Sequence, residues 1–240
     1  DALEEVIRLH LLQQWPFRLH ATYDQSITRI LNVLEHIHST QPVDSVRWIV
    51  DHAETVSDEN LSRIKTLGGS IAVQGRMAFA GEDFVERYGA EQAKRTPSIK
   101  QMLSAGITVG LGTDGTRVSS FNPWATYYWA VSGKTVGGFD LGTEHVDRLT
   151  ALKLFTQGSA ALSGEENVKG RLQPGFYADF AILNHDILKI GEKALLNTQA
   201  QLTVVDGNVV FADRQQYPEL ATPIETAEPA WSPVNFSQQR

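Results

Sequence analysis

The sequence contains no cysteine, which excludes disulfide bonds, thiolate nucleophiles and cysteine-ligated zinc. His, Asp and Glu are therefore the side chains expected to bind any metal ion. An absence of cysteine is compatible with either redox environment, so it leaves the cellular compartment open.

Long runs of one chemical character are missing as well. Lys and Arg number 21 against 28 Asp and Glu, which gives a net charge of −7 without a basic cluster, so we expect no nucleic-acid partner. No apolar run approaches the roughly 20 residues of a membrane helix, so we expect no membrane partner. The 42% hydrophobic content of this 240-residue chain allows a buried core in one large or two small domains.

Helical and strand patterns alternate from residue 1 to about 163, which predicts four βα units around a parallel sheet. The expected strands are short and apolar and lie at residues 16–21, 46–53, 70–74 and 107–114. Helices are expected near 24–38, from 57 to 68, at 97–105 and at 150–163. Asp24 and Ser57 are the expected caps of the first two of these helices. Residues 75–95 read as a long insertion.

The two ends of the chain differ from this pattern. Residues 1–12 read as the middle of an amphipathic helix with no cap before it, so we expect a further N-terminal portion to precede Asp1. Residues 166–213 change to short β-like segments with a hairpin signal at Asp206–Gly207, which predicts a separate small β-module. Residues 214–240 are rich in Pro, Glu, Thr and Ser and are expected to form an extended tail. The predicted domains are therefore 1–165, 166–213 and 214–240.

Three polar residues stand at the carboxyl ends of predicted strands: His20, His52 and Asp114. In a βα barrel these strand ends face the active site. A metal that hydrolyses an amide needs nitrogen or oxygen ligands on rigid elements, an open position for water and a base. Each residue alone also fits a structural role, as a hydrogen-bonded histidine or a turn-forming aspartate. Their equivalent positions in successive units favour a metal site, although the third strand ends in Gln74.

Several stretches of the chain resemble the amidohydrolase superfamily, and within it the YtcJ-like branch of metal-dependent hydrolases. They are LHATYDQSI (19–27), VDHAETVSDENLSRIKTLGGSIAVQ (50–74), LSAGITVGLGTDG (103–115), LTALKLFTQGSAAL (149–162) and the segments within 170–212. The resemblance implies an α/β fold, the C-terminal half of a (β/α)8 TIM-type barrel with part of a small β-sandwich. It also implies that His20 and His52 bind one or two divalent metal ions, with zinc favoured, and that Asp114 binds metal and acts as general base and then acid.

Some features of that family have no counterpart in this sequence. The His-x-His pair of the first barrel strand and the carboxylated Lys or Glu of the fourth are absent, so we expect the chain alone to be inactive. His36-Ile37-His38 has the same His-x-His pattern, but it lies in a predicted helix, where residues two apart point to opposite sides. The Gly110–Gly112 pair lies inside a strand and lacks the GxGxxG helix entry of a dinucleotide site.

The surroundings of the predicted site offer weaker signals. Arg76 follows the third strand and is a candidate to pair with a substrate carboxylate. Trp124, Tyr127, Tyr128 and Trp129 follow the fourth strand, where they can wall a pocket or form core.

The sequence thus predicts a metal-dependent hydrolase of small molecules with carbon–nitrogen, non-peptide, amide-like bonds. One alternative is a non-catalytic fragment or degenerate paralogue, a half-barrel that forms a homo-oligomer through its exposed edges or needs a missing half. Another is a barrel enzyme whose His and Asp residues bind substrate without metal.

Overall fold

The structure is a computed structural model that describes residues 2–220. It divides into two compact units, each described by itself: residues 1–177 with 185–198, and residues 178–184 with 199–240. The predicted domain boundaries stay predictions, and the part of the predicted tail from residue 221 onward lies outside the described residues. No helix within residues 2–220 is both long and apolar enough to cross a membrane.

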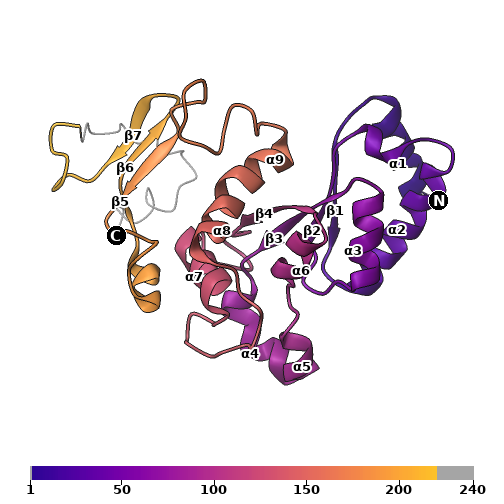
Figure 1. Ribbon diagram of the computed structural model, residues 1–240, viewed down its shortest axis with the longest axis horizontal. Helices are drawn as coiled ribbons and strands as arrows, with labels where there is room; N and C mark the ends of the chain where they lie inside the picture. Colours follow the sequence, from indigo (N-terminus) through magenta and orange to yellow (C-terminus); the bar gives the residue numbers. More distant parts are fainter. Residues whose placement is uncertain (1, 221–240) are drawn as a thin grey trace, which may run out of the picture. The chain divides into compact units, whose positions relative to one another are not determined.

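A four-stranded parallel sheet forms the centre of the first unit, with its strands in chain order (Figure 1). The strands are β1 (Phe17–Ala21), β2 (Trp48–His52), β3 (Ser70–Gln74) and β4 (Thr108–Gly112). Parallel neighbours need a crossover, and helices supply each one here. This order and the strand positions confirm the predicted βα units.

The helices and helical turns of the first unit precede, connect and follow these strands. They are α1 (Ala2–Leu12), α2 (Asp24–His38), η1 (Val43–Ser45), α3 (Asp58–Thr66), α4 (Met77–Tyr88), α5 (Ala90–Ala93), α6 (Ile99–Ser104), α7 (Pro123–Ser132), α8 (Arg148–Lys153), the π-helical turn η2 (Leu154–Gly158), α9 (Ser159–Ser163) and η3 (Glu192–Asn197).

The two faces of the sheet pack against different helices. On one face Phe17 stacks on Trp48 with ring centroids 6.4 Å apart, and the Trp48 indole donates a 2.8 Å hydrogen bond to the Leu67 carbonyl at the end of α3. On the other face Gly110 lies so close to α9 that an added Cβ would stand 2.5 Å from Leu162. The sheet is therefore covered on both sides at β4.

The predicted insertion at 75–95 is largely helical, because α4 and α5 occupy most of it. Met77, Ala78, Gly81 and Phe84 of α4 are buried at helical spacing. The glycine in this stripe is a packing requirement, since a Cβ at Gly81 would lie 2.7 Å from Leu141. A residue that reads as a helix breaker here allows close approach of a neighbouring segment.

The second unit contains a three-stranded antiparallel sheet in the order β5-β6-β7. Its strands are β5 (Phe180–Leu183), β6 (Ala200–Val205) and β7 (Asn208–Ala212). Asp206 and Gly207 join β6 to β7 with φ values of 51° and 74°. Positive φ at both central residues is the requirement of a type I′ turn, so the predicted hairpin is confirmed.

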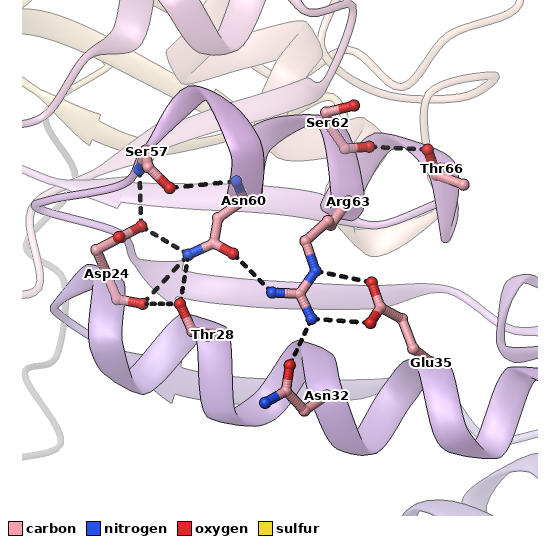
Figure 2. Close-up of polar contacts among 9 residues, drawn as sticks. All are labelled: Asp24, Thr28, Asn32, Glu35, Ser57, Asn60, Ser62, Arg63 and Thr66. Atoms are coloured by element: carbon pink, nitrogen blue, oxygen red, sulfur yellow. Dashed lines mark hydrogen bonds and ion pairs between the residues drawn. The ribbon is translucent and has the colours of Figure 1, made fainter.

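A network of hydrogen bonds connects the amino ends of α2 and α3, directly after the strands that carry His20 and His52 (Figure 2). We call this network the polar lock; its members are Asp24, Thr28, Ser57, Asn60 and Arg63. The predicted cap at Asp24 is wrong: Tyr23 holds the N-cap position of α2, while the Asp24 carboxylate accepts from the Ser57 amide at 2.7 Å and from the Asn60 side chain at 2.7 Å. Asp24 therefore bonds to the neighbouring helix instead of its own. Ser57 caps α3 as predicted, by accepting from the Asn60 amide.

Asn60 is the most constrained member of this lock. It is 2% exposed. The nitrogen of its side-chain amide donates to Asp24 and to Thr28, and the oxygen of the same group accepts from Arg63 at 3.0 Å. All of its polar atoms are thus satisfied inside the protein.

Replacing Asn60 with aspartate is expected to lower the free energy of unfolding by about 2–4 kcal/mol, because a buried carboxylate at position 60 would face the Asp24 carboxylate without a donor between them. The matched control is Asn32→Asp, since the Asn32 side chain oxygen accepts from Arg63 at 2.6 Å and a charge there strengthens the contact. We expect a change below about 0.5 kcal/mol for the control. Urea denaturation of both variants measures the difference, and equal effects would contradict the lock.

Candidate active site at the carboxyl ends of the parallel strands

His20 and His52 meet at the carboxyl ends of β1 and β2. The parallel register pairs His20 with Asp51 and Ala21 with His52, so the two imidazoles lie one step apart on neighbouring strands. His52 Nε2 is 2.8 Å from His20 Nδ1, and the ring centroids are 4.5 Å apart. For this contact to be a hydrogen bond, one of the two nitrogens must carry a proton, and the tautomers decide which one donates. The structure therefore brings two of the predicted ligands into direct contact.

The backbone at the strand ends is unusual. His52, Ala53 and Asp114 have φ values of 83°, 44° and 52°, in the region that side-chain-bearing residues rarely occupy. Such conformations cost on the order of 1–3 kcal/mol each and persist where the surroundings enforce them. Two of the three residues are ones that the sequence predicts for the site.

The electrostatic environment keeps His52 neutral. Burial lowers its pKa below the ordinary value of 6.5 and the adjacent His20 lowers it further, while the negative charges of Asp114, Asp51 and Glu54 act in the opposite direction. A neutral imidazole is the form that binds a metal ion. The influence of Asp114 on this pKa also places its carboxylate near the histidine pair.

Asp114 and His52 line one cavity of about 300 Å³ beside β3 and β4. Arg18 and Asp51, which form a 2.6 Å ion pair, lie on its wall, as does Gln74. Within residues 2–220 no three His, Asp or Glu side chains gather closely enough to hold a metal ion together. The assignment of His20, His52 and Asp114 as metal ligands stays a prediction.

The chemistry of the histidine pair fits a divalent metal. A tetrahedral zinc ion with Zn–N distances of about 2.0–2.1 Å holds two nitrogen ligands about 3.3 Å apart. The observed 2.8 Å between His20 and His52 needs only a small opening to reach that spacing. The two imidazoles are therefore close enough to fit such an ion as two of its ligands.

Glu54 is a charged residue of the site that the sequence reading missed. Its side chain is only 1% exposed, and it accepts hydrogen bonds from Gln74 Nε2 at 2.8 Å and from Arg76 Nη1 at 2.5 Å. A buried carboxylate requires such partners, because desolvation without them costs several kcal/mol. The only sequence signal was its place two residues after His52.

The contact with Glu54 bears on two earlier expectations. Because a carboxylate only accepts hydrogen bonds, Glu54 fixes the Gln74 amide with its nitrogen toward the carboxylate. Arg76, the predicted partner of a substrate carboxylate, is paired with the protein's own carboxylate and remains 32% exposed. Its role toward substrate stays a prediction.

The aromatic cluster after β4 is buried in α7, with Tyr127, Tyr128 and Trp129 each at most 2% exposed.

Comparison with known proteins gives a consistent result. A family model described as the amidohydrolase family matches residues 1–211. Amidohydrolase YtcJ of Bacillus subtilis is 27% identical over 218 residues, which cover 88% of this chain and 40% of that protein. N-substituted formamide deformylase of Arthrobacter pascens is 27% identical over 193 residues, covering 79% of this chain and 35% of that protein.

Solved structures support the same fold. An uncharacterized metal-dependent hydrolase from Pyrococcus horikoshii superposes with a TM-score of 0.67 and 29% identity, over 79% of this chain and 38% of that one. The predicted resemblance and the predicted partial barrel with a small β-sheet are confirmed. The chain spans about 40% of the length of the relatives it matches.

The two neighbours of His52 should shift its pKa in opposite directions. Replacing His20 with glutamine removes a cause that lowers this pKa, so we expect it to rise; replacing Asp114 with asparagine removes a cause that raises it, so we expect it to fall. NMR titration of the imidazole resonances measures both shifts. His185, which is not among the groups that shift the pKa of His52, serves as control, and its replacement should leave the value unchanged. An Asp114→Asn variant with an unshifted His52 would place Asp114 away from the pair.

Proposed function

The chain belongs to the amidohydrolase family, and from this premise we propose that it contributes His20, His52 and Asp114 to a metal-dependent hydrolase of carbon–nitrogen, non-peptide bonds. The observation that carries the proposal is the 2.8 Å contact between His20 and His52 on adjacent parallel strands. Two imidazoles on rigid strand ends supply two nitrogen ligands for a metal ion.

In this proposal His20 and His52 hold one or two divalent ions, with zinc favoured. A bound metal of this kind lowers the pKa of water toward about 7 and polarises the scissile carbonyl. Asp114 accepts the proton of the attacking water at a carboxylate oxygen and returns it to the leaving nitrogen. Burial lowers the pKa of His52, so protons compete less with a metal for its imidazole at neutral pH.

The name of one relative supports a substrate class. The deformylase of Arthrobacter pascens is named for N-substituted formamides, which carry a non-peptide C–N bond. We propose small amides of this kind as substrates. Arg76 would bind a substrate carboxylate only through nitrogens that its contact with Glu54 leaves available.

Metal content and amide hydrolysis test the proposal together. His20→Ala and His52→Ala are expected to weaken zinc binding by at least about 100-fold, because each removes a ligand atom. Asp114→Asn is expected to lower kcat for an N-substituted formamide by about 10²- to 10⁴-fold. Elemental analysis and formate release provide the two measurements.

Both measurements are made on this chain and on the longest polypeptide that carries it, because the chain matches only part of its relatives. His36→Ala, at an exposed position of α2, is the matched control and should change neither quantity. A longer polypeptide that binds no metal, or whose metal content ignores His20 and His52, would refute the proposed site.

An alternative proposal is a non-catalytic half-barrel that self-associates. The observation in its favour is that β1 and β4 are both edge strands among the described residues. Open edges tend to pair with another chain. Phe17 donates its amide to Arg47, so in the alternating pattern of a parallel ladder the Arg18 amide faces away from β2.

If β1 is the associating edge, the 26.6 kDa chain should sediment as a dimer. Arg18→Pro should then shift it to a monomer, because the substitution removes an outward-facing N–H without breaking the β1–β2 ladder. Sedimentation velocity measures the change, and Thr203→Pro in the second unit is a control for general effects of proline. A wild-type chain that is monomeric at all concentrations would exclude this association.

A further inference from the structure

We propose that the hollow walled by Tyr23, Phe84 and Tyr88 binds a neutral aryl group of the substrate. This inference rests on the proposed function for its occupant, and it names the part of the substrate that the metal-facing residues leave undefined. Three features of the hollow support it: the three aromatic rings, the charged residues around them and the position of the rings beside the histidine strands.

Three aromatic rings from separate segments meet at this place. Tyr23 precedes α2, while Phe84 and Tyr88 lie one turn apart near the end of α4. The ring centroids of Phe84 and Tyr88 are 4.7 Å apart, and those of Tyr23 and Tyr88 are 6.2 Å apart, both tilted. Phe84 is 5% exposed, whereas Tyr23 and Tyr88 are 37% and 44% exposed. The buried ring forms a floor, and the two tyrosines present ring surface to a ligand.

The hollow is large enough for an aryl group. Its volume is about 550 Å³, and Val56 adds apolar wall from the β2–α3 connection. A dry cavity of about 150 Å³ lined by apolar side chains is enough to hold benzene. A substituted or bicyclic ring system therefore fits with room for a linking chain.

The charged residues on the wall are already paired. The Asp24 carboxylate accepts from the Ser57 amide and from Asn60. Arg95 donates to Asp58 at 2.8 Å and to Gln101 at 2.9 Å. Gln25 and Gln92 complete the wall with neutral amides. A ligand with its own charge would lose hydration without gaining an unpaired counter-charge, so the hollow favours a neutral group.

The hollow lies at the end of the sheet that carries the histidines. Tyr23 follows His20 by three residues, and Thr55 follows His52 by three. The Thr55 amide donates to the Thr22 carbonyl at 3.2 Å, and the Thr55 hydroxyl accepts from the Asp24 amide at 3.1 Å, which holds the two connections together. The wall of the hollow is therefore tied to the two connections that leave the histidine strands.

Binding is tested first with a probe that contains no C–N bond. We expect 4-fluorobenzyl alcohol, followed by fluorine NMR on the full chain, to bind more tightly than 4-fluorobutanol and than the anion 4-fluorobenzoate. Tyr88→Leu and Tyr23→Leu should each weaken binding of the aryl alcohol about threefold to tenfold, from loss of ring–ring contact. Tyr88→Phe should retain most of it.

Phe79→Leu is the matched control, because Phe79 lies on α4 at 40% exposure and does not line the hollow. Equal binding of the aryl and alkyl alcohols, or an equal loss in Phe79→Leu and Tyr88→Leu, would overturn the proposal.

A second measurement separates this proposal from the proposed function. With N-(2-phenylethyl)formamide and N-hexylformamide as substrates of the longest polypeptide that carries the chain, Tyr88→Leu should raise KM for the aryl compound alone. Hydrolysis of both without aryl preference would overturn the aryl site and leave the hydrolase intact. Aryl binding that depends on Tyr88 without hydrolysis would support the site and count against the hydrolase.

Discussion

The contact between the amino ends of α2 and α3 is the constraint on which the candidate site depends. His20 is the second-last residue of β1 and His52 the last residue of β2, where ladder hydrogen bonds end and the chain is free to diverge. Asp24 prevents this by accepting from the Ser57 amide and from Asn60 in the next βα unit. One carboxylate thus satisfies a helix terminus and fixes two connections. The parallel register of β1 and β2 brings His20 and His52 within 2.8 Å of each other, and this attachment holds the connections that follow them.

Burial and charge act against each other beneath this pair. Glu54 brings a negative charge two residues from His52, which taken alone favours imidazolium. Arg76 and Gln74 neutralise and solvate that carboxylate from β3 and the segment that follows it. Burial is the largest influence on His52 and lowers its pKa. The site therefore keeps an acidic residue close by while holding the histidine in its neutral, metal-binding form.

The sequence was informative where local pattern and position coincide. Alternating βα units and polar residues at strand ends identify His20, His52 and Asp114 as candidates, because their place in the fold depends only on the strand they follow. Glu54 was missed because its significance arises from Gln74 and Arg76, about 20 residues away. The helix α4 was missed because Gly81 lowers the helix propensity of this segment. The close contact with Leu141 nevertheless requires a glycine at this position. The helix α7 is buried on all sides and shows no polar face to reveal its period.

The two glycines of β4 show how similar residues serve different purposes in one strand. Gly110 is required for packing, since a Cβ there would lie 2.5 Å from Leu162 of α9. Gly112, two residues on and therefore on the same face, has no heavy atom within 4 Å of an added Cβ and opens onto the cavity. Leu162 fills the space over Gly110. The space over Gly112 stays open because glycine has no side chain, and Asp114 follows two residues later. This face of β4 is therefore closely packed at Gly110 and open at Gly112. The open space at Gly112 is part of the cavity that Asp114 shares with His52.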